Sequence, residues 1–220
     1  QTNSDKESLY GSVLFKHKFK KPRRTISLNA DWNLLTTESS NYLKSNNRDF
    51  FNGFTLIEDQ LRETDKTTQK LSVKAVYTEP LSKKYSMEVS HEVSYNSGTN
   101  NQLTYGYTSA TGKYDFVVDS LSNDFEQSIV INKPALKISF SDKKIKYFFG
   151  SGFGFTNFDF LDKTFNKDYL RNFTNFFPSA GFTYTYKSNH SLRINYNGNT
   201  TQPTLNQLQP LRNNNNFFNQ

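Results

Sequence analysis

Residues 71–95, LSVKAVYTEPLSKKYSMEVSHEVSY, decide the fold class because apolar side chains occupy every second position on both sides of a short turn. The series before the turn is Leu71, Val73, Ala75 and Tyr77, and the series after it is Tyr85, Met87, Val89, His91, Val93 and Tyr95. Successive side chains of a β-strand point to opposite faces, so a period of two predicts a strand with one apolar and one polar face. The segment therefore predicts a β-hairpin, whose apolar face could meet a protein core or lipid.

The same period recurs in three further pairs of segments. They are residues 13–19 with 26–34, 136–140 with 145–155, and 180–186 with 190–196. A short turn separates the two members of each pair, as expected for hairpins. The sequence therefore predicts eight strands in four hairpins.

The connections between the hairpins are much longer than the turns within them. They lie near residues 37–70, 96–123 and 157–177, with a tail at 198–220, and all are rich in Asn, Ser, Thr or Asp. Connections of this length are uncommon in compact soluble domains. Strict alternation places all short turns at one end of the strands, which is typical of outer-membrane barrels with short periplasmic turns and long extracellular loops. Within the second long connection, Leu103, Tyr105 and Tyr107 are predicted to face Tyr114 and Phe116 in a smaller hairpin.

Composition supports the same class. Only 34% of the 220 residues are hydrophobic, and no run approaches the roughly 18 apolar residues of a membrane-spanning helix. Cysteine is absent, which excludes disulfides, zinc–cysteine sites and thiol nucleophiles. The net charge of +7 is spread over strand ends and is densest in KHKFKKPRR, which we interpret as a solvated turn, so no nucleic-acid partner is expected.

An antiparallel transmembrane β-barrel is the fold class that these patterns predict. Strands of about 9–11 residues suffice to cross the hydrocarbon layer when tilted, and aromatic residues near strand ends suit the headgroup level. The residues predicted to face the membrane are Ile26, Leu28, Trp32, Leu71, Val73, Tyr77, Tyr85, Met87, Val89, Val93, Tyr95, Phe149, Phe153, Phe155, Phe182, Tyr184, Leu192, Ile194 and Tyr196. Ser86, Glu88, Ser90 and Glu92 then face a lumen.

Two motifs resemble a known family. The segment VYTEPLSKKYSMEVSHEVSY resembles the YTEPL turn, basic pair and following strand of the TonB-dependent receptor barrels of Bacteroidetes-type bacteria. The segment FFPSAGFTYTYKSNHSLRINYNGNTTQPTLNQLQPL resembles the P-S-x-x-x-x-Y strand, short turn, L-R-x-x-Y strand and R-P-x-x-x-x-L-x-P loop of the same barrels. The matching residues are Tyr77, Glu79, Pro80, Leu81, Pro178, Ser179, Tyr184, Leu192, Arg193, Tyr196, Pro203, Leu208 and Pro210. Gln202 departs from the arginine that often precedes the proline in that family.

The resemblance implies an outer-membrane receptor for TonB-dependent nutrient uptake. It implies outer-membrane lipid, an extracellular ligand and a TonB-type partner, which would act through a plug domain that this chain does not contain. Such barrels have 22 strands. Residues 1–220 are therefore expected to be a segment of a larger barrel, with a complete eight-stranded barrel as the alternative. Two other functions stay open: a non-transport barrel for adhesion or surface scaffolding, and a soluble β-sandwich that binds glycans.

No catalytic or cofactor site is predicted. Gly150, Gly152 and Gly154 alternate within a strand, so GSGFGF is interpreted as glycines facing the lumen, where another backbone such as a plug could approach, and not as a phosphate-binding loop. The three histidines are far apart in sequence and lack metal-ligand spacing, so no metal site is expected. The absence of a G-x-S-x-G nucleophile motif favours a chain that is not an enzyme.

Overall fold

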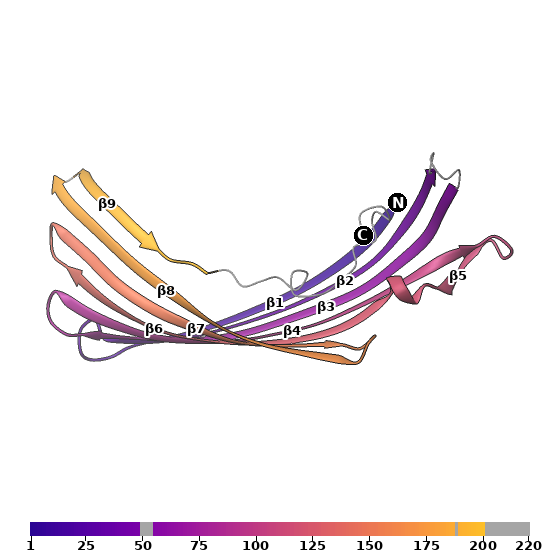
Figure 1. The fold of residues 1–220 in the computed structure, drawn as a ribbon. Helices are drawn as coiled ribbons and strands as arrows, with labels where there is room; N and C mark the ends of the chain where they lie inside the picture. The colour runs from indigo at the N-terminus through magenta and orange to yellow at the C-terminus, as the bar shows by residue number, and fades with distance from the viewer. Residues whose placement is uncertain (49–54, 188, 201–220) are drawn as a thin grey trace.

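The fold is a single antiparallel β-sheet that bends into an open trough (Figure 1). The computed structural model describes residues 1–48, 55–187 and 189–200. The elements in this part of the chain are β1 (Thr2–Lys18), β2 (Thr25–Arg48), β3 (Thr55–Pro80), β4 (Tyr85–Thr108), β5 (Lys113–Val117), the short 3-10 helix η1 (Asp119–Leu121), β6 (Asn123–Ser141), β7 (Ile145–Asp162), β8 (Lys167–Lys187) and β9 (His190–Asn197). Among the described residues, no helix has the length and apolar character needed to cross a membrane.

The strand order follows the chain, β1-β2-β3-β4-β6-β7-β8-β9, and β5 pairs with the far end of β4. Tyr107 lies opposite Tyr114 in that side pairing, which confirms the smaller hairpin. Within the described residues, β1 pairs only with β2 and β9 only with β8, so the sheet is not closed. The predicted meander of hairpins is thus confirmed, and the open sheet is consistent with part of a larger barrel. A β-sandwich is not formed, because these strands make one sheet.

The short turns all lie at one end of the sheet, on the left of Figure 1. In the first turn, the amide of Arg24 donates a hydrogen bond to the carbonyl of Lys21 at 3.1 Å. Pro22 occupies the second position, which suits its fixed φ, and Arg23 takes the third position with a φ of 70°. An arginine therefore stands where a left-handed backbone favours glycine or asparagine.

The long connections differ from the prediction, because most of them are strand. β2 and β3 remain paired from Thr25 opposite Thr78 to Arg48 opposite Thr55. β7 and β8 remain paired as far as Asp162 opposite Lys167. The prediction of loops near 37–70, 96–123 and 157–177 is therefore wrong in secondary structure. The physical reason is that a ladder satisfies the backbone groups of Ser-, Thr- and Asn-rich segments even where neither face shows an apolar period.

The tail near 198–220 lies outside the described residues except for its first three positions. Pro203, Leu208 and Pro210, which carry part of the family resemblance, and the departing Gln202 are also outside them.

Candidate functional site

All nineteen residues predicted to face the membrane lie on one face of the sheet, called the outer face below. In an antiparallel ladder, directly opposed residues share a face. Tyr95 lies opposite Leu71, which in turn lies opposite Trp32. In the other direction Met87 lies opposite Ile138, and Ile138 opposite Phe149. The same register continues through β8 to β9, where Phe182 lies opposite Ile194. The register therefore joins eight separate apolar series into one band, whose contact with lipid remains a prediction.

The apolar band has a clear limit on β4 and on β7. On β4 it covers residues 85–95 and on β7 residues 145–155, which is the length that a tilted strand needs to cross the hydrocarbon layer. The next outer positions are Ser97, Thr99 and Asn101 on β4, and Asn157 and Asp159 on β7. Many outer side chains of the band are exposed, as for Phe149 at 65%, and others such as Trp32 and Met87 are half-buried. On these two strands, polar outer positions thus end the apolar band after one membrane-sized height.

The opposite, inner face reverses this pattern. Beyond the height of the band it carries a buried cluster of Phe125, Phe158 and Phe160, with exposed fractions of 3–6%. The rings of Phe125 and Phe160 lie 5.0 Å apart, and Tyr169 packs 5.9 Å from Phe160. The sequence pattern did not predict this cluster. The sequence does contain a sign of it, because Phe158 and Phe160 are two positions apart. They have even numbers, whereas the band residues of β7 have odd numbers, so the two phenylalanines lie on the opposite face. The cluster explains why β6, β7 and β8 continue past the band.

Within the height of the band the inner face is polar and hollow. Lys137 donates to Glu88 across β4 and β6 at 3.0 Å, and Lys74 pairs with Glu92 across β3 and β4 at 3.7 Å. These side chains border a cavity of about 390 Å³ that β7 and β8 also line. A cavity shared by five neighbouring strands requires a concave surface, so the polar face is the inside of the trough. The register places Ser86 and Ser90 there as well, as the sequence predicted.

The glycines of β7 lie on this inner face, and side chains of the neighbouring strands fill the space beside them. A Cβ atom on Gly154 would lie 2.8 Å from the ring of Phe177, and one on Gly150 would lie 2.7 Å from the hydroxyl of Ser179. Gly181 on β8 has the same role, because a Cβ there would overlap the ring of Phe148. The predicted open approach for another backbone at Gly150 and Gly154 is therefore filled by neighbouring side chains.

Two lysines complete this arrangement. The ammonium of Lys133 lies 5.9 Å from the centre of the Phe177 ring, and that of Lys137 lies 5.9 Å from the centre of the Phe148 ring. Both distances fall in the range of cation–π attraction. Glycine, ring and ammonium are thus layered in two places on the cavity wall.

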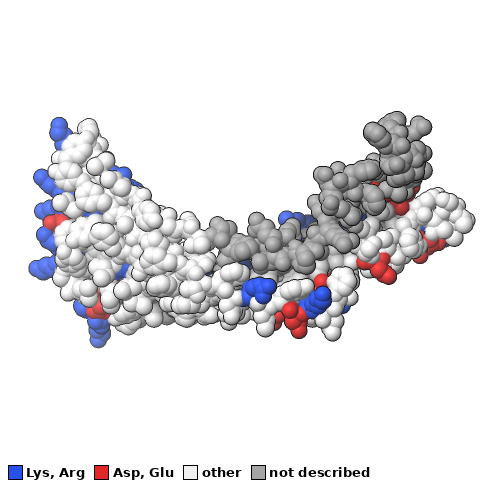
Figure 2. All heavy atoms as spheres, viewed as in Figure 1, with Lys and Arg blue, Asp and Glu red and all other residues white. Residues whose placement is uncertain are grey.

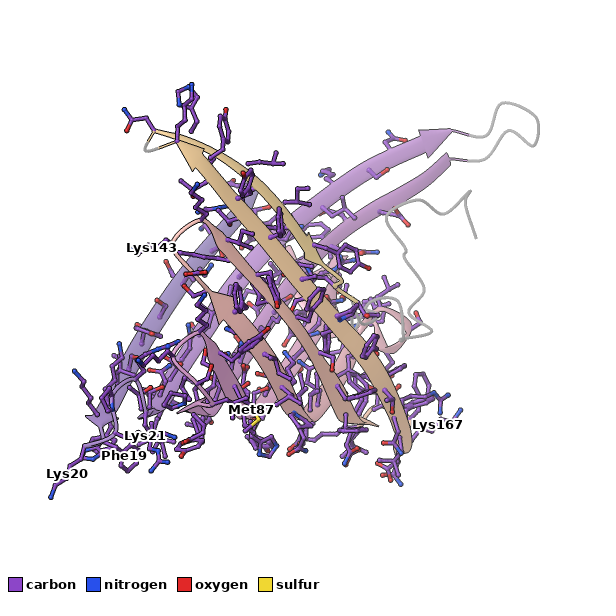
Figure 3. All side chains as sticks on the ribbon, turned by 90° about the vertical axis from the view of Figure 1, so that its left-hand side faces the viewer. Phe19, Lys20, Lys21, Met87, Lys143 and Lys167 are labelled. Atoms are coloured by element: carbon purple, nitrogen blue, oxygen red, sulfur yellow. The ribbon has the colours of Figure 1, made fainter. Side chains whose placement is uncertain are left out.

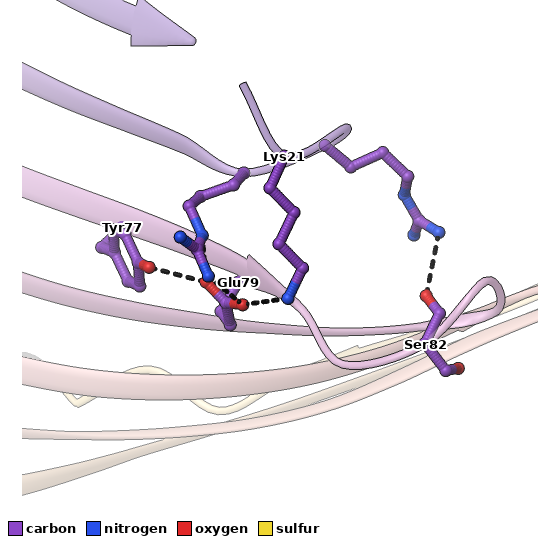
Figure 4. Close-up of polar contacts among 6 residues, drawn as sticks. Lys21, Tyr77, Glu79 and Ser82 are labelled. Carbon is purple, nitrogen blue, oxygen red and sulfur yellow. Dashed lines mark hydrogen bonds and ion pairs between the residues drawn. The ribbon is translucent and has the colours of Figure 1, made fainter. Parts of the chain in front are cut away.

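At the short-turn end, Glu79 joins two turns (Figure 4). It accepts hydrogen bonds from Arg24 at 2.7 and 2.9 Å, from Lys21 at 2.5 Å and from the hydroxyl of Tyr77 at 2.6 Å. Arg23 donates to the carbonyl of Lys83 at 2.6 Å in the adjacent turn. The bonds from Arg24, then Lys21 and Tyr77, hold the pKa of Glu79 well below its ordinary value. Tyr77 and Glu79 of the YTEPL segment therefore lock the first turn to the second.

At the far end of β3, a second carboxylate is paired in a similar way. Asp59 accepts a hydrogen bond from the hydroxyl of Tyr114 at 2.6 Å and lies 3.0 Å from the ammonium of Lys44. The bonds from Tyr114 and Lys44 lower the pKa of Asp59, and the bond to Asp59 raises the pKa of Tyr114 to about 12. This contact fastens the β4–β5 hairpin to β3.

The three histidines are not brought together. His17 lies opposite Ile26 on β2, His91 opposite Ala75 on β3, and His190 opposite Lys187 on β8. Within residues 1–48, 55–187 and 189–200, no three His, Asp or Glu residues are grouped so that they could hold a metal ion. What the arrangement can do chemically is to expose an apolar band on one side and a polar, ion-paired cavity on the other.

Comparison with known proteins agrees with this geometry. The sequence profile described as the outer membrane protein beta-barrel family matches residues 17–220. No curated protein sequence matches the chain. Among solved structures, the sheet is similar to the ferric citrate transporter FecA in its unliganded form, with a TM-score of 0.61 and 10% sequence identity. The likeness covers 86% of this chain and 27% of that one, so the chain spans about a quarter of the transporter's length.

The outer band predicts unequal effects of two neighbouring substitutions. Val89→Arg places a charge near the middle of the band and should destabilise the protein in a bilayer by about 2–4 kcal/mol. Ser90→Arg places the same charge on the polar inner face and should be tolerated. Urea unfolding of the full-length protein in phospholipid vesicles measures both, and equal effects would contradict the assigned faces.

The layered glycines predict a coupled pair of substitutions. Gly181→Ala should cost about 1–3 kcal/mol because its methyl group would overlap the Phe148 ring. Phe148→Ala should remove most of that cost, which gives a coupling free energy of about 0.5–3 kcal/mol in a double-mutant cycle. Gly11→Ala is the control, since the nearest atom to its Cβ lies 4.0 Å away. Additive effects of the two substitutions would show that the ring does not use this space.

The contacts of Glu79 that join the first two turns predict that the stability of the protein depends on pH. Because the pKa of folded Glu79 lies below its ordinary value of 4.5, its contribution is present in full above about pH 4.5 and is lost as the pH falls towards the lowered pKa. Glu79→Gln should therefore reduce stability at pH 7 and flatten the loss of stability between pH 5 and 3. Urea unfolding at several pH values in a non-ionic detergent tests this. Glu63→Gln, at an exposed position of β3, should leave the pH profile unchanged.

Proposed function

Because the chain belongs to the outer membrane protein beta-barrel family, we propose that it forms part of the wall of a bacterial outer-membrane receptor that takes up a scarce nutrient with energy from a TonB-type partner. The observation that carries this proposal is the polar, ion-paired cavity on the inner face, directly behind the apolar band. Such a wall separates lipid from an aqueous interior. The transporter FecA has a similar fold, and at 10% identity that likeness concerns the fold alone.

In the proposed receptor, the segments beyond the band capture a ligand and inner-face groups then offer it polar contacts. Glu88 and Glu92 each have a lysine partner, so the wall carries charge without leaving those carboxylates unpaired. Lys133 has only an aromatic partner among the described residues, and its ammonium remains available to an anionic or hydroxyl-rich ligand. A TonB-type partner would act through a plug domain outside this chain. The proposal includes no catalytic step and no cofactor.

Adhesion or surface scaffolding is the second candidate, and one observation favours it. β2 continues for fourteen residues beyond Leu34, where the apolar band ends on that strand. At about 3.3 Å per residue, the paired β2 and β3 extend roughly 45 Å past the band. An extension of that length could present a surface to other cells. The family is one of outer-membrane barrels, which argues against the soluble glycan-binding alternative.

Uptake by intact cells separates the two candidates. The gene for the full-length protein is deleted, and cells are tested for uptake of labelled iron chelates, vitamins, peptides and oligosaccharides under limitation. Loss of one class of uptake is expected, with restoration by the wild-type gene and abolition by a protonophore. Lys133→Gln should lower uptake while leaving the amount of folded protein in the outer membrane unchanged. Normal uptake of every class, together with loss of surface attachment, would contradict transport and favour scaffolding.

A further inference from the structure

The net positive charge of the chain is concentrated at the short-turn end. Residues 16–24, 79–84, 141–146 and 187–193 contain thirteen Lys or Arg residues and two acidic ones, a net charge of +11. The rest of the chain has fourteen basic and eighteen acidic residues, a net charge of −4. Figure 2 shows the blue side chains gathered at the left edge, over the short turns, while most of the visible red ones lie farther right. The sheet is therefore strongly polarised along its strands.

The basic end borders the apolar band through a row of aromatic side chains on the outer face. The hydroxyls of Tyr85 and Tyr147 lie 3.1 Å apart, and Phe140 stacks on Tyr147 with ring centres 4.8 Å apart. On β8, Tyr184 and Tyr186 lie 6.3 Å apart. Rings with one apolar and one polar side favour the headgroup level of a membrane. The row therefore marks where the hydrocarbon layer would end.

Lysines stand next to the residues of this row in the sequence. Lys84 precedes Tyr85, Lys146 precedes Tyr147 and Lys187 follows Tyr186. Lys83 lies two residues from Tyr85 and Lys143 three residues from Phe140, which is at most about 7 and 10 Å along an extended chain. Lys146 shares a strand with Tyr147 and so points to the inner face, whereas Lys83 and Lys143 lie on the turns, close to the height at which the phosphates of lipid headgroups would lie.

Much of this charge has no partner within the protein. Lys20, Lys83, Lys143 and Lys187 are exposed, one on each short turn, and form no ion pair with any described residue. We call these four residues the basic rim. Figure 3 shows Lys20 and Lys143 at the turns, directed away from the ribbon. Glu79 and Asp142 neutralise only other cations, namely Lys21, Arg24 and Lys84.

The geometry points to anionic phospholipid headgroups as the partner, so we propose that the basic rim binds the phosphates of the leaflet next to the short turns. Three observations agree on lipid: the rim adjoins the apolar band, its charges recur on all four turns across the sheet, and the aromatic row lies between band and rim. Arg23, with its positive φ, adds a cation where glycine would fit the backbone better. This proposal does not depend on transport and would hold for a scaffold as well.

The test compares lipid retention by two charge-matched variants of the full-length protein. Wild type is reconstituted in nanodiscs of equimolar phosphatidylcholine and phosphatidylglycerol, and native mass spectrometry counts the lipids that stay bound. The rim variant combines Lys20→Gln, Lys83→Gln, Lys143→Gln and Lys187→Gln. The control variant combines Lys6→Gln, Lys66→Gln, Lys113→Gln and Lys167→Gln, which removes the same charge from exposed positions toward the other end. Heat-modifiable migration on gels confirms that each is folded.

The expected result is preferential retention of phosphatidylglycerol by the wild type and by the control variant. In the rim variant, the preference for phosphatidylglycerol should be at least about fivefold lower, because each lysine near a charged membrane surface contributes about that factor to binding. The wild-type preference should also fall in 1 M NaCl, where the Debye length is only about 3 Å. Equal retention by both variants would overturn the proposal. Salt-sensitive binding of an acidic peptide with unchanged lipid retention would instead assign the rim to a protein partner.

Discussion

Hydrocarbon cannot hydrogen-bond to a peptide group, and this constraint governs the whole sheet. Every backbone N–H and C=O within the apolar band must find a partner on a neighbouring strand. Antiparallel pairing from β1 to β9 provides most of these partners, and the exceptions among the described residues are the free edges of β1 and β9, the break at Pro134 and the register shift near Thr185. Because register also fixes which side chains share a face, the same ladder aligns eight apolar series into one band. The polar inner cavity is then a consequence, since every second side chain must point away from the band.

Short-range pattern in the sequence predicts the hairpins, the faces and the turns, but not the height of the strands. The period of two around Val89 and Phe149 suffices to assign each strand, and the structure confirms all four main hairpins. The strand extensions were not predicted because segments such as residues 37–46 are mostly polar on both faces and resemble loops. Their ladder is reinforced by contacts between residues far apart in sequence, such as Asp59 with Tyr114. The same reason hid the bonds from Lys21 and Arg24 to Glu79, which link residues more than fifty positions apart.

The glycines illustrate how a correct placement can still give an incomplete explanation. Parity alone puts Gly150, Gly152 and Gly154 on the inner face, as the register confirms. What parity does not give is the neighbour across the ladder, which is Phe177 for Gly154 and Ser179 for Gly150. A ring needs a flat surface to lie on, and a residue without a Cβ supplies one. Each glycine is thus matched to a side chain on the next strand, and the pairing allows Lys133 and Lys137 to cover the rings.

The unequal extension of the strands past the band has a geometric consequence for whatever approaches the cell. β2 continues fourteen residues beyond Leu34, where its apolar band ends, whereas β7 continues only seven beyond Phe155. At about 3.3 Å per residue, one side of the wall is taller than the other by more than 20 Å. The edge of the sheet opposite the short turns is therefore slanted, with β2 and β3 on its taller side and β7 and β8 on its shorter side. An approaching particle would therefore meet β2 and β3 before it met β7 and β8.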